Sequence, residues 1–137
     1  SNKYNRVLSH RDINLENILW LSDTKAVLID WESAGFIDPM VELLGVATNL
    51  AGIGSGKLDL PLVRTTVYAY QASLKNKKIV MNQELYLQSY ATWFHWLDYC
   101  LSKSQHASFE IDIEIRNTLK AIELLEQHKY QVLSFFK

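Results

Sequence analysis

Two short apolar runs near the start of the chain are separated by a polar turn, and this pattern predicts a β-hairpin. Residues 17–21 (Asn-Ile-Leu-Trp-Leu) and 26–29 (Ala-Val-Leu-Ile) are rich in β-forming side chains, and Ser-Asp-Thr-Lys at 22–25 lies between them. A polar cluster between two such runs is typical of a hairpin turn. Antiparallel pairing places the two outer ends of a hairpin side by side.

Helical patterns dominate the rest of the chain. Asp38 followed by Pro39 is a favourable helix start, and the glycine-rich segment 52–56 ends the helix that it predicts. Apolar side chains at helical spacing predict further helices over about 61–75 and about 82–102.

The segment 109–133 carries two competing patterns. Its first residues, Phe-Glu-Ile-Asp-Ile-Glu-Ile-Arg at 109–116, alternate strictly, which is typical of a strand. However, Ile111, Ile115 and Leu119 continue a helical stripe, and an acidic start suits the N-terminus of a helix. We therefore predict a helix over 109–133.

Length, composition and charge are those of an ordinary folded domain. The 137 residues are 48% hydrophobic and 21% charged, which predicts a single domain over 1–137. The helical and hairpin patterns above predict its fold class, which is mainly α with a small β-hairpin. A net charge of −1 and a pI near 6.4 give no basis for binding nucleic acid or an anionic membrane. One cysteine, no long apolar stretch and no signal-peptide pattern predict a soluble, cytoplasmic protein. The sequence makes no prediction of oligomeric state.

Three polar residues flank the predicted hairpin and have the types that phosphoryl transfer needs. Asp12 lies five positions before Asn17, which opens the first strand, and Asp30 follows the second strand. A carboxylate accepts or orients the proton of an attacking hydroxyl, while an Asn and a second carboxylate hold the magnesium that binds the nucleotide phosphates. Because Asn17 and Asp30 fall at adjacent ends of the hairpin, we predict that they share a metal site. The alternative is a set of ordinary loop residues, since Asp and Asn are common in turns.

Three neighbouring features are predicted to be structural. His10 is expected to be a buried imidazole that bonds backbone near the loop, and Arg11 is expected to be structural or to make a surface pairing. The segment 52–57 (Gly-Ile-Gly-Ser-Gly-Lys) suggests a phosphate-binding loop, but that pattern needs Gly where Ala51 stands and Ser or Thr where Leu58 stands. It is predicted to be a flexible connection between helices.

The helix over 82–102 carries an aromatic row that has two interpretations. Trp93, Trp96 and Tyr99 recur at intervals of three and share one side of the helix. Such rows are most often core, but indole faces are also the best protein partners for a quaternary ammonium. The acidic residues at 110–114 likewise form either a solvated helix start or a surface that attracts a polycationic substrate.

The chain reads His-Arg-Asp-Ile-Asn-Leu-Glu-Asn-Ile-Leu at 10–19, Ile-Asp-Trp-Glu at 29–32 and Gly-Phe-Ile-Asp-Pro-Met-Val-Glu-Leu at 35–43. This order of motifs resembles that of the aminoglycoside phosphotransferase and choline kinase-like superfamily. The consensus motifs of that superfamily are close to H-G-D-x-x-x-x-N-I-L, I-D-W-E and G-x-x-D-P-x-x-D-L. Arg11 and Glu42 depart from this consensus, which has Gly and Asp at the two positions.

The resemblance implies a role for each matching residue. Asp12 is the implied catalytic base, and Asn17 and Asp30 are the implied ligands of the magnesium that accompanies ATP or GTP. Glu32 is implied to assist the metal or the substrate. The implied reaction moves the γ-phosphate of the nucleotide to a hydroxyl of a small, cationic molecule, as an aminoglycoside phosphotransferase does.

Two alternatives stand beside this function. Some choline kinases use a Trp-x-x-Trp pair in an ammonium cage, and Trp93 with Trp96 is similar to it, so a choline or ethanolamine kinase is the first. The second is a non-catalytic binding or scaffold domain, against which the intact site argues. The resemblance also implies the C-terminal lobe of a protein kinase-like fold. Because the catalytic loop starts at residue 10, the N-terminal nucleotide-binding lobe is expected to be absent from this chain and the isolated chain inactive.

Overall fold

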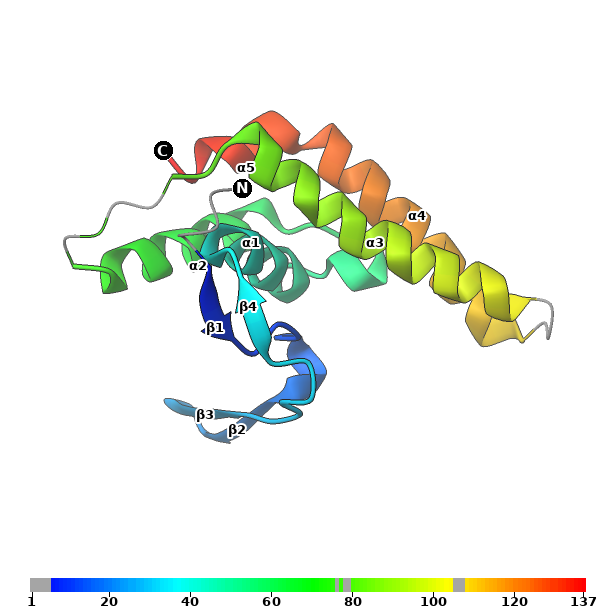
Figure 1. Cartoon of the computed structure of the whole chain (residues 1–137), viewed down its shortest axis with the longest axis horizontal. Helices are drawn as coiled ribbons and strands as arrows, with labels where there is room; N and C mark the ends of the chain where they lie inside the picture. The colour runs from blue at the N-terminus through cyan, green and yellow to red at the C-terminus, as the bar shows by residue number, and fades with distance from the viewer. Residues whose placement is uncertain (1–5, 76, 78–79, 105–107) are drawn as a thin grey trace.

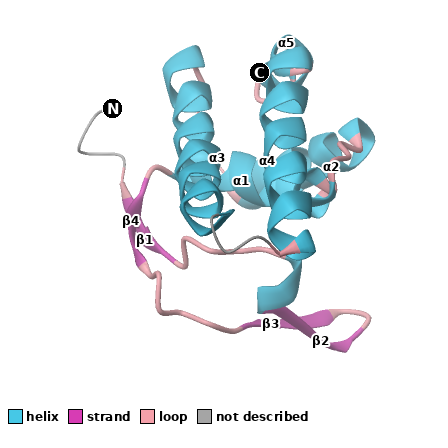
Figure 2. Cartoon of the chain, turned by 90° about the vertical axis from the view of Figure 1, so that its right-hand side faces the viewer, coloured by secondary structure: helices cyan, strands magenta, loops and turns pink. Residues whose placement is uncertain are grey.

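The computed structural model describes residues 6–75, 77, 80–104 and 108–137 (Figure 1). Residues 6–38 form a strand-bearing segment, and the described residues from 39 onward form a helical body. The strands lie below the helices in Figure 1, and Figure 2 shows that the β2–β3 pair lies apart from the helical body. The elements in chain order are β1 (Val7–Ser9), η2 (Leu15–Asn17), β2 (Ile18–Ser22), β3 (Lys25–Leu28), β4 (Gly35–Ile37), α1 (Pro39–Leu50), η3 (Ile53–Ser55), α2 (Leu60–Ser73), α3 (Gln83–Lys103), α4 (Phe109–Gln127) and α5 (Lys129–Ser134).

The predicted hairpin is confirmed, and a second strand pair accompanies it. β2 and β3 pair antiparallel with Ile18 opposite Leu28. β1 and β4 also pair antiparallel, with Ser9 opposite Gly35, and this pair was not predicted. Three-residue strands are too short to show an alternating pattern, and these two come from distant parts of the sequence. The β1–β4 pair closes the segment that carries the motifs.

The predicted helices are confirmed, and their N-terminal caps explain where they begin. Asp38 Oδ1 accepts the N–H two residues further on at 2.8 Å, at the start of α1. Asn82 Oδ1 accepts the N–H three residues further on at 2.9 Å, at the start of α3. Each cap satisfies a backbone donor that has no partner inside its helix. The segment 109–133 is helical rather than a strand, although it divides at His128 into α4 and α5.

The hydrophobic core lies among the helices. Leu44 of α1, Val63 of α2, Tyr86 of α3 and Val132 of α5 are all 0% exposed. The glycine-rich segment is a connection between helices, as predicted, and contains the 3₁₀ turn η3 between residues with positive φ at 52 and 56. Among the described residues, no helix combines the length and the apolar character needed to cross a membrane.

Several large apolar side chains of the strands are left exposed by the part of the chain that the structure describes. Leu8 of β1 is 70% exposed, Trp20 of β2 is 67% exposed and Phe36 of β4 is 60% exposed. A two-stranded hairpin is marginally stable unless a further strand or a packing partner supports it. Apolar side chains gathered on a surface in this way are typical of an interaction site.

Candidate active site

Asp12 lies on the loop between β1 and η2, and two side-chain amides hold its carboxylate. Its Oδ1 accepts a hydrogen bond from Asn14 Nδ2 at 3.3 Å, and its Oδ2 accepts one from Asn17 Nδ2 at 3.2 Å. Asn17 Nδ2 also donates to the carbonyl oxygen of Asp12 at 2.9 Å. Because Asp12 is exposed, its carboxylate is both restrained and accessible to a substrate.

The hairpin brings Asn17 and Asp30 to neighbouring positions. The N–H of Ile29 donates to the carbonyl oxygen of Asn17 at 3.0 Å, which continues the strand pairing one step beyond the hairpin. Asp30 therefore directly follows the residue opposite Asn17. Its φ of 59° lies in the left-handed region, which Asp and Asn tolerate better than most residues. The nitrogen of the Asn17 side-chain amide faces Asp12. The oxygen of the same amide points away from Asp12 and accepts no hydrogen bond from a described residue.

His10 joins the Asp12 loop to the end of β3, and its predicted structural role is confirmed. The ring is 1% exposed, and its Nε2 lies 2.7 Å from the carbonyl oxygen of Ile29. Its Nδ1 accepts the N–H of Asp12 at 3.1 Å. A carbonyl can only accept, so the proton of the neutral ring is on Nε2. The ring also lies 4.6 Å from the indole of Trp31, between centroids.

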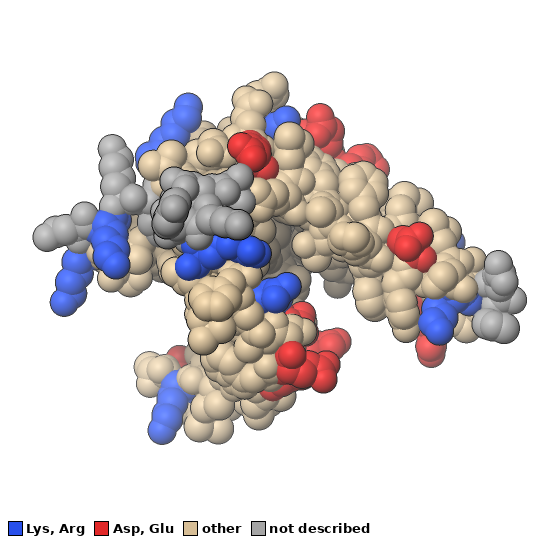
Figure 3. All heavy atoms as spheres, in the orientation of Figure 1, with Lys and Arg blue, Asp and Glu red and all other residues tan. Residues whose placement is uncertain are grey.

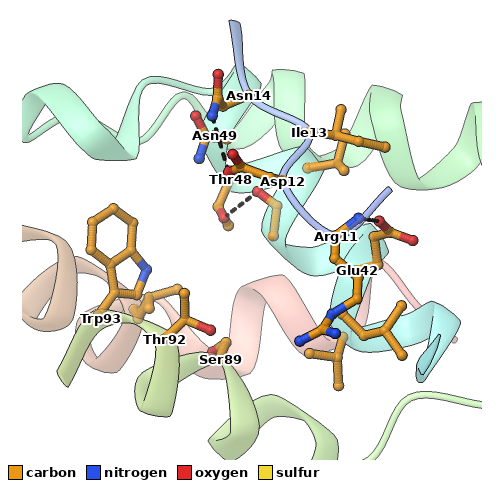
Figure 4. Close-up of a pocket in the computed structure, with 15 residues that line it drawn as sticks. Arg11, Asp12, Ile13, Asn14, Glu42, Thr48, Asn49, Ser89, Thr92 and Trp93 are labelled. Atoms are coloured by element: carbon orange, nitrogen blue, oxygen red, sulfur yellow. Dashed lines mark hydrogen bonds between the residues drawn. The ribbon is translucent and has the colours of Figure 1, made fainter. Parts of the chain in front are cut away.

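Arg11 contacts Glu42. These are the two residues that depart from the consensus motifs. Arg11 has a φ of 69°, and its backbone N–H donates to Glu42 Oε1 at 2.9 Å (Figure 4). The Arg11 side chain lies against Gly35, where a Cβ would stand 2.5 Å from Arg11 Nη1. A glycine is therefore required there for the guanidinium to keep its place. The predicted surface pairing of Arg11 is made by its backbone and not by its side chain.

A small cavity of about 150 Å³ lies beside Asp12, between the Asp12 loop, α1 and α3. In Figure 4, Thr92 and Trp93 face Asp12 and Asn14 from across this cavity. A wider groove of about 820 Å³ adjoins it. Asn14, Thr92 and Trp93 line both spaces, so the groove extends from the immediate surroundings of Asp12.

The aromatic row of α3 faces this groove. Trp93 is half-buried and packs against the core, which is the core role expected for at least one of the two indoles. Trp96 is 42% exposed and stacks on Tyr99, with ring centroids 5.3 Å apart and planes 23° apart. Lys103 Nζ lies 5.7 Å from the centre of the Tyr99 ring. One face of the Trp96 indole and one face of the Tyr99 ring therefore cover each other, and a ligand cannot contact these two faces.

The groove is acidic. Glu16 of η2 and Glu114 of α4 line it, and no Lys or Arg is among its lining residues. Glu114 Oε2 accepts a hydrogen bond from Trp96 Nε1 at 3.4 Å. Figure 3 shows acidic atoms gathered on the strand-bearing segment. A cleft with one sign of charge concentrates ligands of the other sign.

Glu32 was predicted as a site residue and Asn14 was not, but only Asn14 contacts Asp12. Glu32 is exposed, makes no hydrogen bond or ion pair with another described residue and lines neither space beside Asp12. Asn14 was not predicted as a site residue, although it contacts Asp12. Its signal was local: Asn is a preferred first residue of a helical turn, and here it caps η2.

The donor set suits magnesium better than a softer ion. Magnesium takes oxygen ligands and is usually held by one or two protein groups together with substrate phosphates and water. The Asn17 amide oxygen and the Asp30 carboxylate are of this kind. Within the described residues no group of three His, Cys, Asp or Glu forms a metal cage of its own, so the phosphates would complete the coordination.

The phosphotransferase enzyme family is the family whose model matches this chain, over residues 2–72. The matched stretch contains the Asp12 loop, the hairpin and α1, and the chain belongs to this family. No curated protein and no solved structure matches the chain.

Proposed function

We propose that this chain is the C-terminal lobe of a small-molecule kinase with a protein kinase-like fold. The complete kinase transfers the γ-phosphate of ATP or GTP to a hydroxyl of a small, cationic acceptor, as an aminoglycoside phosphotransferase does. The observation that carries the proposal is the contact between Asp12 and Asn17, with Asp30 one residue beyond the position opposite Asn17. These residues bring a base and two magnesium ligands to one place.

In the proposed reaction Asp12 acts on the acceptor. Its carboxylate accepts the proton of the acceptor hydroxyl, whose oxygen forms the new bond to the γ-phosphorus. The bond from that phosphorus to the bridging oxygen breaks, and the nucleoside diphosphate leaves with its electron pair. Asn17 and Asp30 hold the magnesium, which neutralises charge on the phosphates.

The strand-bearing segment is the proposed docking face of a nucleotide-binding lobe. Such a lobe supplies the lysine and the phosphate-covering loop that position the nucleotide. The exposed apolar side chains of β1, β2 and β4 lie on the same segment as Asn17 and Asp30. A lobe that packs on Leu8, Trp20 and Phe36 is therefore adjacent to the proposed metal site and gives the hairpin the partner it needs.

The acidic groove is the proposed acceptor site. Its volume of about 820 Å³ suits a molecule larger than choline, and Glu16 and Glu114 provide partners for amines. The stacking of Trp96 on Tyr99 leaves fewer ring faces for an enclosing ammonium cage. These features favour an aminoglycoside-type acceptor, and choline or ethanolamine remains the second candidate because Trp93 and Trp96 both face the groove.

The variant Asp12→Asn tests the proposal in the full protein. We expect kcat to fall about a hundredfold or more with little change in nucleotide affinity, since a general base contributes about 10²–10⁴-fold. Asp30→Asn should instead weaken binding of the magnesium nucleotide. Asp98→Asn, at an exposed position of α3 that lines neither space beside Asp12, is the matched control and should leave both quantities unchanged. Wild-type turnover by Asp12→Asn would mean that Asp12 is structural and not the base, whereas no turnover by the wild-type full protein would favour a non-catalytic binding domain.

The lobe assignment has its own test. The 137-residue chain alone should show negligible transfer of phosphate to an aminoglycoside or to choline, because positioning of the phosphates supplies most of the catalysis. Turnover by the isolated chain at about 1 per second or more, the usual range for kinases, would contradict the assignment.

A further inference from the structure

Asn14 makes three hydrogen bonds that fix the orientation of its amide. Its Oδ1 accepts the backbone N–H of Glu16 at 2.9 Å and that of Asn17 at 3.2 Å, which caps η2. Its Nδ2 donates to Asp12 Oδ1 at 3.3 Å. Because the oxygen is held by two backbone donors, the nitrogen of the planar amide must point away from them, and Asp12 lies on that side (Figure 4).

The Asp12 carboxylate is therefore held at both oxygens. Asn17 bonds one oxygen and the backbone of the same residue, while Asn14 bonds the other oxygen. With Asn17 alone, the Asp12 side chain could change its rotamer about the Cα–Cβ bond, and the carboxylate would lose the direction in which it accepts a proton. A general base works only when it is aligned with the proton that it takes, and small misplacements lower the rate strongly.

We propose that Asn14 is a positioning residue that couples the cap of η2 to the orientation of the Asp12 carboxylate. The inference rests on the proposed function, in which Asp12 is the base. Asn14 lines both the cavity beside Asp12 and the acceptor groove, so it holds the carboxylate at the junction where the acceptor hydroxyl arrives.

Three variants separate this role from capping. Asn14→Ser and Asn14→Asp keep an oxygen that can cap η2, but neither has the amide donor, and Ser adds no charge. In the full protein, with ATP and an aminoglycoside or choline as probes, both should lower kcat about tenfold, equivalent to one lost charge-assisted hydrogen bond, with each KM changed less than about twofold. Their melting temperatures should stay near that of the wild type. Asn14→Ala loses both contacts and should melt lower as well.

Either of two kinetic results would overturn the inference. If Asn14→Ser kept the wild-type kcat, Asn14 would only cap the turn. If the KM for the acceptor rose while kcat stayed constant, Asn14 would instead contact the acceptor. Asp12→Asn in the same assay tests the proposed function separately. If that variant kept full activity, Asp12 would not be the base, whatever the result for Asn14. In the Asp12→Asn background, Asn14→Ser should have no further effect on kcat, and an additive loss would count against the coupling.

A measurement without turnover uses the 137-residue chain itself. Three-bond NMR couplings to the Asp12 carboxyl carbon report whether the side chain occupies one rotamer. We expect one rotamer in the wild type and in a Gln88→Ser control on α3, and averaged couplings in Asn14→Ser. Identical couplings in wild type and Asn14→Ser would refute the positioning role even if no acceptor were found.

Discussion

The helical body and the strand-bearing segment of this protein are held together in different ways. In the body, side chains such as Leu44, Val63 and Tyr86 are fully buried and hold the helices by packing. In the strand-bearing segment, Trp20 and its apolar neighbours are exposed, and polar side chains bonded to backbone hold the site: His10 to Ile29, and Asn17 to the Asp12 loop. The body therefore sets the stability of the chain, while directional contacts set the geometry of the site.

The largest expected effect is on the body. Leu44→Ala should lower the free energy of unfolding by about 2–5 kcal/mol, because it removes a fully buried side chain and leaves a cavity. Trp20→Ala, on the exposed hairpin, should change the free energy of unfolding of this chain by less than about 0.5 kcal/mol. Urea unfolding of both variants measures the difference. If Trp20→Ala cost as much as Leu44→Ala, the hairpin would belong to the main cooperative unit.

How far the sequence predicts each region follows from the kind of contact that holds it. The helices and the β2–β3 hairpin are visible because periodicity, caps such as Asp38 and polar turns are local signals. The β1–β4 pair depends on contacts between distant residues, and its three-residue strands carry no pattern. The sequence also named Asn17 and Asp30 as neighbours through the hairpin, and it named Asp12 through its position five residues before Asn17. It could not single out Asn14, because the direction of an amide depends on the turn that it caps.

The next effect concerns the bond between the Asp12 loop and β3. His10→Ala removes the acceptor of the Asp12 N–H and the donor to the Ile29 carbonyl, at a cost of about 1–3 kcal/mol to the local structure. Amide hydrogen exchange at Asp12 should speed up much more than exchange at Leu44 in the core. His95→Ala, an exposed histidine of α3, is the control. Unchanged exchange at Asp12 in His10→Ala would show that the β1–β4 pair alone holds the loop.

A smaller effect separates the two indoles of α3. Trp93 packs against the core, so Trp93→Ala should lower the melting temperature and reduce activity for every acceptor as the folded fraction falls. Trp96 is partly exposed in the groove, so Trp96→Ala should leave the melting temperature nearly unchanged. If Trp96 contacts a cationic acceptor, the KM for a quaternary amine should rise by the equivalent of about 1–2 kcal/mol. A sharp drop in melting temperature for Trp96→Ala, with no change specific to one acceptor, would remove choline as a candidate.

The smallest effect lies in the body and depends on pH. Burial, and secondarily the charge of Glu126, raise the pKa of the Tyr86 hydroxyl, which donates to the Leu125 carbonyl at 2.6 Å. Tyr86→Phe removes that bond and should lower the free energy of unfolding by about 1 kcal/mol near pH 8.

Above about pH 10 the difference between Tyr86→Phe and the wild type should shrink. The unfolded wild type then releases the Tyr86 proton, while the folded state with its raised pKa keeps it, so the unfolded state binds fewer protons and the wild type loses stability as pH rises. The variant has no such group and lacks this part of the loss. Urea unfolding at pH 8 and at about pH 10.5 measures the change, and Tyr68→Phe, an exposed tyrosine of α2, should alter neither value. A difference that stays constant between the two pH values would mean that Tyr86 ionises equally in the folded and unfolded states, which would contradict the raised pKa of the buried hydroxyl.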